Sequence, residues 1–281
     1  RIRAGILENG TTQMLKKAGV SDRLEKEGFD HDGIQLSFKN HGFRINLKEL
    51  TNKHVTVYGQ TEVTKDLYRI IKKENGNIIN NAEDVLPQAV QTDAPFVTFK
   101  KDGVEKKIKC DLVAGCDGFH GISRTVIPKS IIKSFERKYP FGWLGILSET
   151  PPVSEELIYA NHGNGFALAS MRNENLSRYY IQTPLNEKIE AWTDQKFWDE
   201  LKKRLPTEAA DTIITGSSIE KSIAPLRSFV CEPMSWEKLF LVGDAAHIVP
   251  PTGAKGLNLA VSDVHYLHNA LKNYYKFNTN D

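Results

Sequence analysis

Apolar and polar positions repeat along this chain with two different periods, and each period predicts a different kind of element. Residues 33–49 alternate between apolar and polar side chains in "GIQLSFKNHGFRINL", which is typical of a β-hairpin. Residues 195–205 instead carry apolar side chains three and four positions apart, among them Phe197 and Leu201, which predicts a helix with one apolar face. The chain therefore mixes both kinds of element.

The same two patterns extend over most of the sequence. Helices are expected over 1–28 and from 60 to about 73, the second one after a short strand that starts near 54. Two strands are expected about the Lys-Asp-Gly turn in "PFVTFKKDGVEKKIK", and the block 139–183 holds four strand-like runs. This order predicts an α/β fold of the α+β kind, in which an α/β domain carries an inserted, mostly antiparallel sheet layer.

The stretch "LFLVGDAAHIVPPTGAKGLNLA" (239–260) joins a strand to a helix through a rigid loop. Leu239–Val242 is a short apolar run that fits a buried strand, prolines and glycines follow, and apolar positions recur at helical spacing from Leu257 onward. Asp244 therefore stands at the carboxyl end of a strand, a few residues before a helix N-terminus. This is where open α/β sheets bind ligands, so we interpret the stretch as a ligand site.

A second stretch, "CDLVAGCDGFHGISR" (110–124), has the same order of elements. A predicted strand leads into Asp117 and Gly118, and Gly118 permits backbone shapes that other residues resist. An ordinary Asp-Gly turn explains these residues equally well when they are taken alone. A second aspartate at a strand end, beside the first, favours a shared site.

The block 157–182 offers a candidate site for an anionic substrate. Alternation along "GFALASMR" places Ser170 and Arg172 on one sheet face, and "SRYY" places Arg178 and Tyr180 on a shared face. Serine and arginine directed together bind a carboxylate, and a tyrosine can hydrogen-bond a phenol. An exposed sheet face, where arginine and tyrosine are ordinary, is the alternative that spacing alone favours.

Composition narrows the choice of function. The chain has 281 residues and a net charge of +2, so no polyanionic partner and no nucleic acid is implied. No apolar run approaches the ~18 residues of a membrane span. Three cysteines without a CxxC pair argue against a disulfide framework and a zinc site, and the eight histidines lack metal-binding spacing, so we expect no metal and a cytoplasmic location.

Six segments together resemble the flavoprotein aromatic hydroxylases, and in particular those that act on 4-hydroxybenzoate. They are "GDAAHIVPPTGAKGLNLA", "AGCDGFHGISR", "YPFGWLGIL", "ELIYANH", "SRYY" and "SIAPLRSF", and the likeness covers essentially the whole chain. The resemblance implies an FAD-dependent monooxygenase that uses NADPH and O2, by way of a flavin hydroperoxide, to convert 4-hydroxybenzoate to 3,4-dihydroxybenzoate. It also implies a homodimer and a part in the catabolism of aromatic compounds.

The resemblance implies specific roles for residues near the cofactors. Asp244 would bind the ribityl chain of FAD, and the loop 250–258 would lie against the isoalloxazine ring. The further contacts that it implies for FAD or NADPH are Arg1, Arg3, Gln60, Asp117, Gly118, Gly253, Gly256, Leu257, Asn258, His120, Arg124 and Arg227. Solvated arginines at a helix start are the structural alternative for Arg1 and Arg3.

The resemblance also implies roles at the substrate. Ser170, Arg172 and Tyr180 would hold its carboxylate, with Arg178 between substrate and flavin. Tyr159 would hydrogen-bond the phenol, assisted by the Pro251 carbonyl and beside Thr252. His31 would end a proton relay to solvent, although its setting in "FDHDG" alone predicts a surface loop residue.

The family's first strand, its GxGxxG turn and its C-terminal helices have no counterpart in this sequence. We therefore expect a fragment of a longer enzyme that binds FAD poorly and is inactive on its own. The expected domains are a Rossmann-like FAD-binding domain over 1–30 and 50–134, a substrate-binding sheet layer over 31–49 and 135–225, and the FAD-binding strand-loop-helix unit over 226–281. A related hydroxylase of another phenolic acid and a non-catalytic flavin- or aromatic-binding module are the alternatives.

Overall fold

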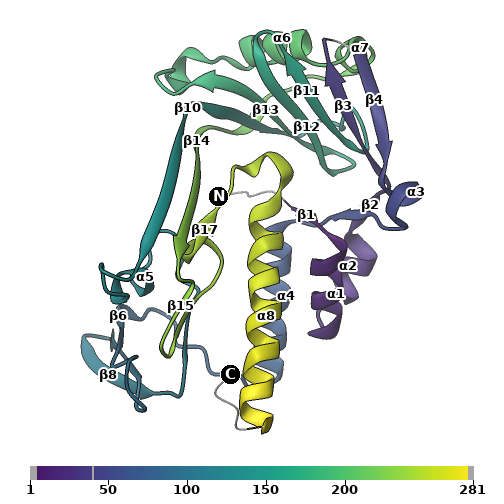
Figure 1. Cartoon of the computed structure of the whole chain (residues 1–281). Coiled ribbons are helices and arrows are strands. Elements are labelled where there is room, and N and C mark those ends of the chain that lie inside the picture. Colours follow the sequence, from purple (N-terminus) through teal and green to yellow (C-terminus); the bar gives the residue numbers. More distant parts are fainter. Residues whose placement is uncertain (1–4, 40, 278–281) are drawn as a thin grey trace. The chain divides into compact units, whose positions relative to one another are not determined.

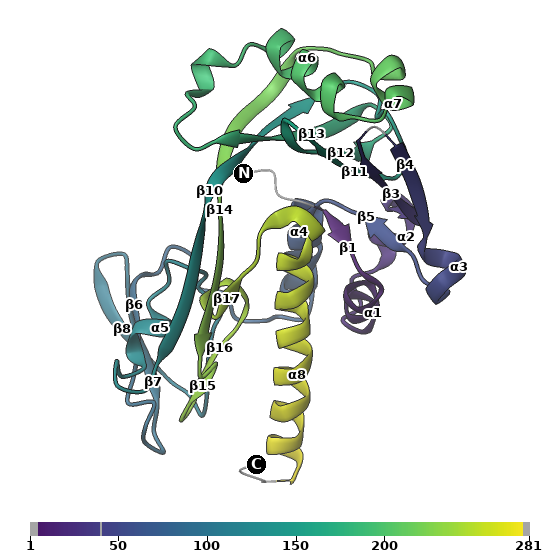
Figure 2. The same ribbon diagram turned by 45° about the horizontal axis from the view of Figure 1, so that its top comes forward.

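The computed structural model describes residues 5–39 and 41–277, and the chain divides into two compact units. The first unit holds residues up to 67 together with 138–226, and the second holds 68–137 together with the residues from 227 onward. Two long strands, β10 (Lys133–Ser148) and β14 (Ser218–Glu232), run through both units. Figures 1 and 2 show the elements of each unit.

The first unit is built on a large sheet with the strand order β14-β10-β13-β12-β11-β3-β4. Its other strands are β3 (Gly33–Phe38), β4 (His41–Asn46), β11 (Leu157–His162), β12 (Gly165–Asn173) and β13 (Leu176–Pro184). β3 and β4 form the predicted hairpin. β11 pairs with β12, and β12 with β13, in antiparallel fashion, whereas β11 pairs with β3 in parallel. The mixed α/β fold with a largely antiparallel sheet is thus confirmed.

Helices cover one face of this sheet. The two helices are α6 (Asp194–Arg204) and α7 (Thr207–Thr212), and Figure 2 shows them over β12 and β13. Tyr179 and Ile181 of β13 and Phe197 and Leu201 of α6 are fully buried in the core between them. Each such side chain contributes about 1.5–3 kcal/mol on burial, and the predicted apolar face of the 195–205 helix is confirmed. The opposite face of the sheet carries the residues of the candidate substrate site.

A small sheet of order β1-β5-β2 completes the first unit. Its strands are β1 (Ile6–Leu7), β5 (Val55–Val57) and β2 (Phe29–His31). The remaining helices of the unit are α1 (Asn9–Lys17), α2 (Asp22–Glu27), α3 (Leu47–Thr51) and the short 3₁₀ turn η1 (Ile189–Ala191). Helix α4 (Gln60–Lys73) begins in this unit and continues into the second. The expectation of helix throughout 1–28 is wrong at residues 6–7, because they pair with β5 and are buried there. Tertiary burial outweighs local helical spacing at this point.

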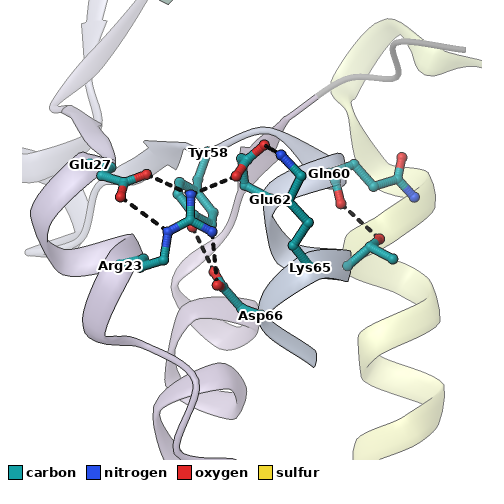
Figure 3. A network of polar contacts seen from close by, with 8 residues as sticks. Arg23, Glu27, Tyr58, Gln60, Glu62, Lys65 and Asp66 are labelled. Carbon is teal, nitrogen blue, oxygen red and sulfur yellow. Dashed lines mark hydrogen bonds and ion pairs between the residues drawn. The ribbon is translucent and has the colours of Figure 1, made fainter. Parts of the chain in front are cut away.

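A polar network ties α2, the residue that follows β5, and α4 together within the first unit (Figure 3). Arg23 of α2 donates to both carboxylate oxygens of Glu27, at 3.1 and 2.9 Å, and to Glu62 of α4 at 2.6 Å. It also donates at 2.9 Å to Asp66, whose second oxygen accepts from the Tyr58 hydroxyl at 2.6 Å. We call Arg23, Glu27, Tyr58, Glu62 and Asp66 the Arg23 network.

The second unit contains two small sheets and a long helix. The sheets have the orders β15-β16-β9 and β6-β7-β8, and β17 pairs with the end of β14. The strands are β6 (Glu83–Gln88), β7 (Phe96–Lys101), β8 (Val104–Lys109), β9 (Val113–Gly115), β15 (Ser235–Trp236), β16 (Leu239–Leu241) and β17 (His247–Ile248). The helices are α5 (Ser123–Val126) and α8 (Lys255–Phe277), with 3₁₀ turns η2 (Gly243–Ala245) and η3 (Pro251–Gly253).

The strand-loop-helix order predicted for 239–260 is confirmed, and the core of the second unit lies under it. Leu239, Leu241, Ala245 and Ala246 are buried there with Phe229. Among residues 5–39 and 41–277, none of the helices is both long and apolar enough to cross a membrane.

Candidate active site

The sheet face opposite α6 and α7 carries the residues that the sequence proposed for the substrate. Tyr159 of β11 stands opposite Leu168 of β12, which stands opposite Tyr180 of β13, which in turn stands opposite Gly145 of β10. Ser170 pairs with Arg178, two residues along the same strands from the pair of Leu168 and Tyr180. Since directly paired residues project to the same face, these side chains share the face opposite α6 and α7. The predicted alternation of this block is confirmed.

Arg172 lies on this face just where β12 departs from regular pairing, between Met171 and Asn173. Its Nε and Nη1 atoms are buried and make no hydrogen bond within the part of the chain that the structure describes. Burial lowers the pKa of the Arg172 guanidinium, and the charge of Arg178 lowers it too, while a hydrogen bond with Tyr180 opposes this. Arginine nevertheless keeps its proton, so Arg172 is a buried cation with donors to spare.

Arg178 is a second buried cation beside the first. The residue is only 3% exposed, and its Nε and Nη1 atoms also lack hydrogen-bond partners among the described residues. Nη1 lies 3.3 Å from Oε2 of Glu220 on β14, which makes an ion pair without a directed hydrogen bond. The guanidinium also stacks over the Tyr180 ring, 5.1 Å from its centroid. A buried cation whose N–H groups lack hydrogen-bond acceptors destabilises the fold. An anionic ligand would supply acceptors to both arginines.

The rest of this face is aromatic. Trp143 is buried, stacks on Phe166 with centroids 5.1 Å apart, and lies 5.3 Å from the ring of Tyr180. Tyr159 lies 6.2 Å from Phe166, and burial raises the pKa of its hydroxyl. Tyr159 is therefore a protonated hydrogen-bond donor beside a wall of rings, which suits a flat aromatic ligand that carries a polar group. The Ser170 hydroxyl donates to the Met171 carbonyl at 3.2 Å.

His31 is not the surface loop residue that its local sequence predicted. It belongs to β2, pairs with Val55 and is 3% exposed. Neither ring nitrogen has a hydrogen-bond partner among the described residues, and burial lowers the pKa of the imidazole. The surface interpretation is wrong because the first three residues of "FDHDG" form strand β2, which pairs with β5. The relay role of His31 stays a prediction.

In the second unit, the two aspartates that follow predicted strands come from neighbouring strands. β9 pairs in parallel with β16, with Gly115 opposite Leu241, and the Val242 N–H donates to the Gly115 carbonyl at 3.0 Å. Asp117 and Asp244 follow the carboxyl ends of these two strands, at the same edge of the sheet. The expectation that two aspartate-bearing strand ends converge is confirmed, and we call this the aspartate edge.

Asp117 has a structural task at this edge. Its Oδ2 accepts the Ser123 N–H at 2.8 Å, at the start of α5. A Cβ at Gly121 would stand 2.0 Å from the Asp117 carboxyl carbon, and Gly118 has a φ of +76°, so this turn requires both glycines. Asp117 thus shapes the loop whether or not a cofactor contacts it.

Asp244 lies in η2 and is half-buried. Its carboxylate has no hydrogen bond or ion pair with another residue in the described ranges 5–39 and 41–277. The preceding Gly243 has a φ of +63°, and its N–H donates at 2.8 Å to Asp263 of α8, which also lies 2.8 Å from the His247 Nε2. The turn is held rigidly by Asp263 while Asp244 keeps its acceptor capacity, so Asp244 fits a ligand with hydroxyl donors.

The loop between η2 and α8 holds further predicted residues. Pro251, Thr252 and Gly253 form η3 and are exposed, and Gly256 and Leu257 begin α8 half-buried. Asn258 is buried and donates to the Ala254 carbonyl at 3.0 Å, which fixes the first turn of the helix. The residues therefore lie on one continuous loop and helix start, as predicted.

The basic residues predicted for NADPH gather around Phe119. Arg124 donates to the Ala245 and Phe119 carbonyls at 2.8 and 2.6 Å, and its guanidinium lies 5.0 Å from the Phe119 ring. Arg227 lies 4.5 Å from the same ring and pairs with Glu136 at 3.3 Å. His120 is exposed and packs edge-on against Phe119 at 5.0 Å. Arg124 thus joins the two loops of the aspartate edge.

Gln60 is a predicted cofactor residue that lies in the first unit. Gln60 begins α4, and its carbonyl accepts from the Thr64 hydroxyl at 2.9 Å, so its side-chain amide is not committed by that bond (Figure 3). Arg1 and Arg3 lie outside the described residues. Among the residues that are described, none form a histidine, cysteine or acidic cluster suited to a metal ion.

Sequence reasoning missed several residues of these sites. Glu220 is 42 positions from Arg178, and nothing in its local pattern connects the two. Trp143 and Phe166 were seen only as strand residues. The sequence indicates a role for Asp263 only weakly, because it is an acid among the regularly spaced apolar residues of α8.

Comparison with known proteins shows the family to which this chain belongs. A family model described as an FAD binding domain matches residues 1–279. The p-hydroxybenzoate hydroxylase of Acinetobacter baylyi is 54% identical over 276 residues, which cover 98% of this chain and 68% of that protein. A kynurenine 3-monooxygenase of Sus scrofa is 22% identical over 265 residues, which cover 89% of this chain and 55% of the relative.

Solved structures show the same fold. PqsL, a probable FAD-dependent monooxygenase from Pseudomonas aeruginosa, matches with a TM-score of 0.84 and 19% identity, over all of this chain and 79% of that one. The p-nitrophenol 4-monooxygenase PnpA of Pseudomonas putida matches with a TM-score of 0.81 and 17% identity, over 99% of this chain and 72% of that one.

Proposed function

Because this chain belongs to the FAD-binding flavoprotein aromatic hydroxylases, we propose that it acts as a 4-hydroxybenzoate 3-monooxygenase, which converts 4-hydroxybenzoate to 3,4-dihydroxybenzoate. The observation that carries the substrate is the pair of buried guanidiniums, Arg172 and Arg178, with donors that no described residue satisfies. A carboxylate is the group that satisfies arginine donors and charge together. Tyr180 and Ser170 stand beside them on the same face.

Arg172 acts by position rather than by chemistry. A carboxylate held in two hydrogen bonds fixes the direction of the aromatic ring to which it is attached, so one particular ring carbon faces the oxidant. Such orientation removes entropy from the reaction step. The wall formed by Trp143 and Phe166 holds the plane of that ring.

Tyr159 acts on the phenol at the other end of the substrate. Its hydroxyl remains protonated because burial raises its pKa, so it can donate a hydrogen bond to the substrate oxygen. Donation to that oxygen favours phenolate, and a phenolate ring is more nucleophilic at the carbon next to the oxygen. We assign to the Pro251 carbonyl the support of this hydrogen bond, to Thr252 a place beside it, and to His31 the far end of the proton path.

The aspartate edge fits FAD. Asp244 offers the ribityl hydroxyls a half-buried carboxylate that no described residue pairs with, on a turn held by Asp263 and joined to the Asp117 loop by Arg124. The start of α8 at Gly256, Leu257 and Asn258 offers backbone N–H groups to the same cofactor. When bound, FAD supplies the redox chemistry that activates O2 with electrons from NADPH.

The remaining assignments concern partners and setting. We assign NADPH to His120, Arg124 and Arg227, where two guanidiniums lie over the Phe119 ring and the His120 ring packs against it. A homodimer, a cytoplasmic location and a role in aromatic catabolism complete the proposal, and the three free cysteines support a reducing compartment.

One experiment tests this function. The FAD-loaded protein is mixed with NADPH and 4-hydroxybenzoate in air, and both NADPH consumption and aromatic products are followed. The expected result is substrate-dependent NADPH oxidation with stoichiometric 3,4-dihydroxybenzoate. NADPH oxidation that another phenolic acid supports better points to a related hydroxylase, and no oxidation with any phenolic acid contradicts the catalytic assignment.

A further inference from the structure

Beside the buried arginines lies an acid, Glu220 of β14, whose position has a consequence for selectivity. We propose that Glu220 is a specificity-determining residue that sets the net charge of the arginine pair to +1, so that the site selects ligands with one negative charge over those with two. The inference rests on the proposed function, because it assumes that Arg172 and Arg178 bind the substrate carboxylate.

The charges near the pair support this balance. Arg172 and Arg178 are both buried cations. Among the residues that the structure describes, Glu220 is the only carboxylate that forms an ion pair with either of them. Two positive charges and one negative charge leave a single positive charge, which one carboxylate neutralises.

The geometry of the contact leaves the donors available. Oε2 of Glu220 approaches Nη1 of Arg178 to 3.3 Å, yet Nη1 makes no hydrogen bond. Glu220 thus compensates charge without occupying the N–H groups that a ligand needs. An acid that made a bidentate pair with Arg178 would instead compete with the substrate for those donors.

The position of Glu220 also sets the size of the effect. The Arg178 side chain is 4% exposed and the Glu220 side chain is 31% exposed, so water screens the acid in part. A unit charge at this kind of depth, several ångströms from a second ligand charge, changes a binding constant by about tenfold. The Glu220 charge therefore changes the affinity of a ligand with two negative charges more than that of a ligand with one.

The test compares two ligands of similar length in the FAD-loaded protein. 4-Hydroxybenzoate carries one negative charge at neutral pH, and terephthalate carries two. Glu220→Gln removes the charge and keeps the shape, Glu220→Asp keeps the charge, and Glu190→Gln is a charge-matched control on exposed η1, which packs on the helix-covered side of the sheet. Dissociation constants are measured by calorimetry at low and high salt.

The expected result is that Glu220→Gln improves terephthalate binding relative to 4-hydroxybenzoate by about tenfold at low salt, with a smaller gain at high salt. Glu220→Asp and Glu190→Gln should leave the ratio of the two constants near that of the unchanged protein. A ratio that Glu220→Gln does not change, or an equal loss for both ligands, overturns the inference and leaves the proposed function intact. Failure of the unchanged protein to bind 4-hydroxybenzoate overturns the proposed function and this inference with it.

Discussion

Arg172 and Arg178 are the residues on which the proposed function depends most, because each is a buried charge that the described residues leave partly unsatisfied. Proteins seldom keep such groups unless a ligand completes them, since an unpaired buried charge is costly. The sequence predicted that Arg172 and Ser170 share a face. It did not predict burial, which depends on how segments distant in the sequence pack around these side chains, and that burial is what decides between an exposed sheet face and a binding site.

Replacing Arg172 with alanine should weaken 4-hydroxybenzoate binding by about 30- to 100-fold, as expected for the loss of a charge-assisted hydrogen bond. Binding is measured by titration of the FAD-loaded protein, with phenol as the matched ligand that lacks the carboxylate. Phenol binding should not change. An equal loss for both ligands would show that the variant damages the site in general.

Replacing Tyr159 with phenylalanine should lower kcat by about 10²-fold, because general acid–base and hydrogen-bond assistance at the phenol contribute on this scale. The dissociation constant of 4-hydroxybenzoate should change much less, since the carboxylate end anchors the ligand. Steady-state kinetics with product analysis separate the two quantities. An unaltered kcat would remove Tyr159 from the reaction.

At the scale of elements, the Arg23 network joins α2, the residue that follows β5, and α4 of the first unit (Figure 3). Asp66 is 5% exposed and receives hydrogen bonds from both Arg23 and Tyr58. The pairing of these residues was not predictable from sequence, because 43 positions separate Arg23 from Asp66. Burial raises the pKa of Tyr58, and its bond to Asp66 raises it further, so its hydroxyl remains a donor.

Replacing Asp66 with alanine should lower the free energy of unfolding by about 3 kcal/mol, because it leaves Arg23 and the Tyr58 hydroxyl short of a buried acceptor. Glu27→Ala is the control, since Glu27 also pairs with Arg23 but its side chain is 51% exposed. An exposed pair contributes about 0–1 kcal/mol. Urea denaturation measures both variants, and equal losses would argue against a buried role for Asp66.

The same network predicts a pH dependence. Hydrogen bonds from Lys65 and then Arg23 lower the pKa of Glu62 below the usual value of a glutamate side chain. The folded state therefore gains stability from Glu62 above pH ~4.5 and loses it as the pH falls through the lowered pKa. Urea midpoints at pH 7, 4 and 3 should fall less steeply for Glu62→Gln than for the unchanged protein. Parallel curves would contradict this.

At the scale of the whole molecule, the sequence predicted the α/β character, the hairpin at 33–49 and the two aspartate-bearing strand ends, because each depends on local periodicity or on a turn. It did not predict the long strands β10 and β14, the strand at Ile6–Leu7, the burial of His31 or the partner of Arg178. These features depend on pairing between segments far apart in the chain, which local spacing does not encode.

The two units carry different parts of the proposed reaction. The first presents a cationic and aromatic sheet face, and the second presents a pair of aspartate-bearing loops braced by Arg124 and Asp263. The chain belongs to the FAD-binding hydroxylases, and we propose that both sets of residues serve one reaction. The claim that joins the whole account is that the buried guanidiniums exist to receive an aromatic carboxylate.

The most direct measurement is a calorimetric comparison of 4-hydroxybenzoate with 4-hydroxybenzamide, which has the same ring and phenol but carries no negative charge. Our account predicts that the FAD-loaded protein binds the carboxylate about 100-fold more tightly than the amide, because only the carboxylate neutralises Arg172 and Arg178. Equal affinity for the two ligands would contradict it.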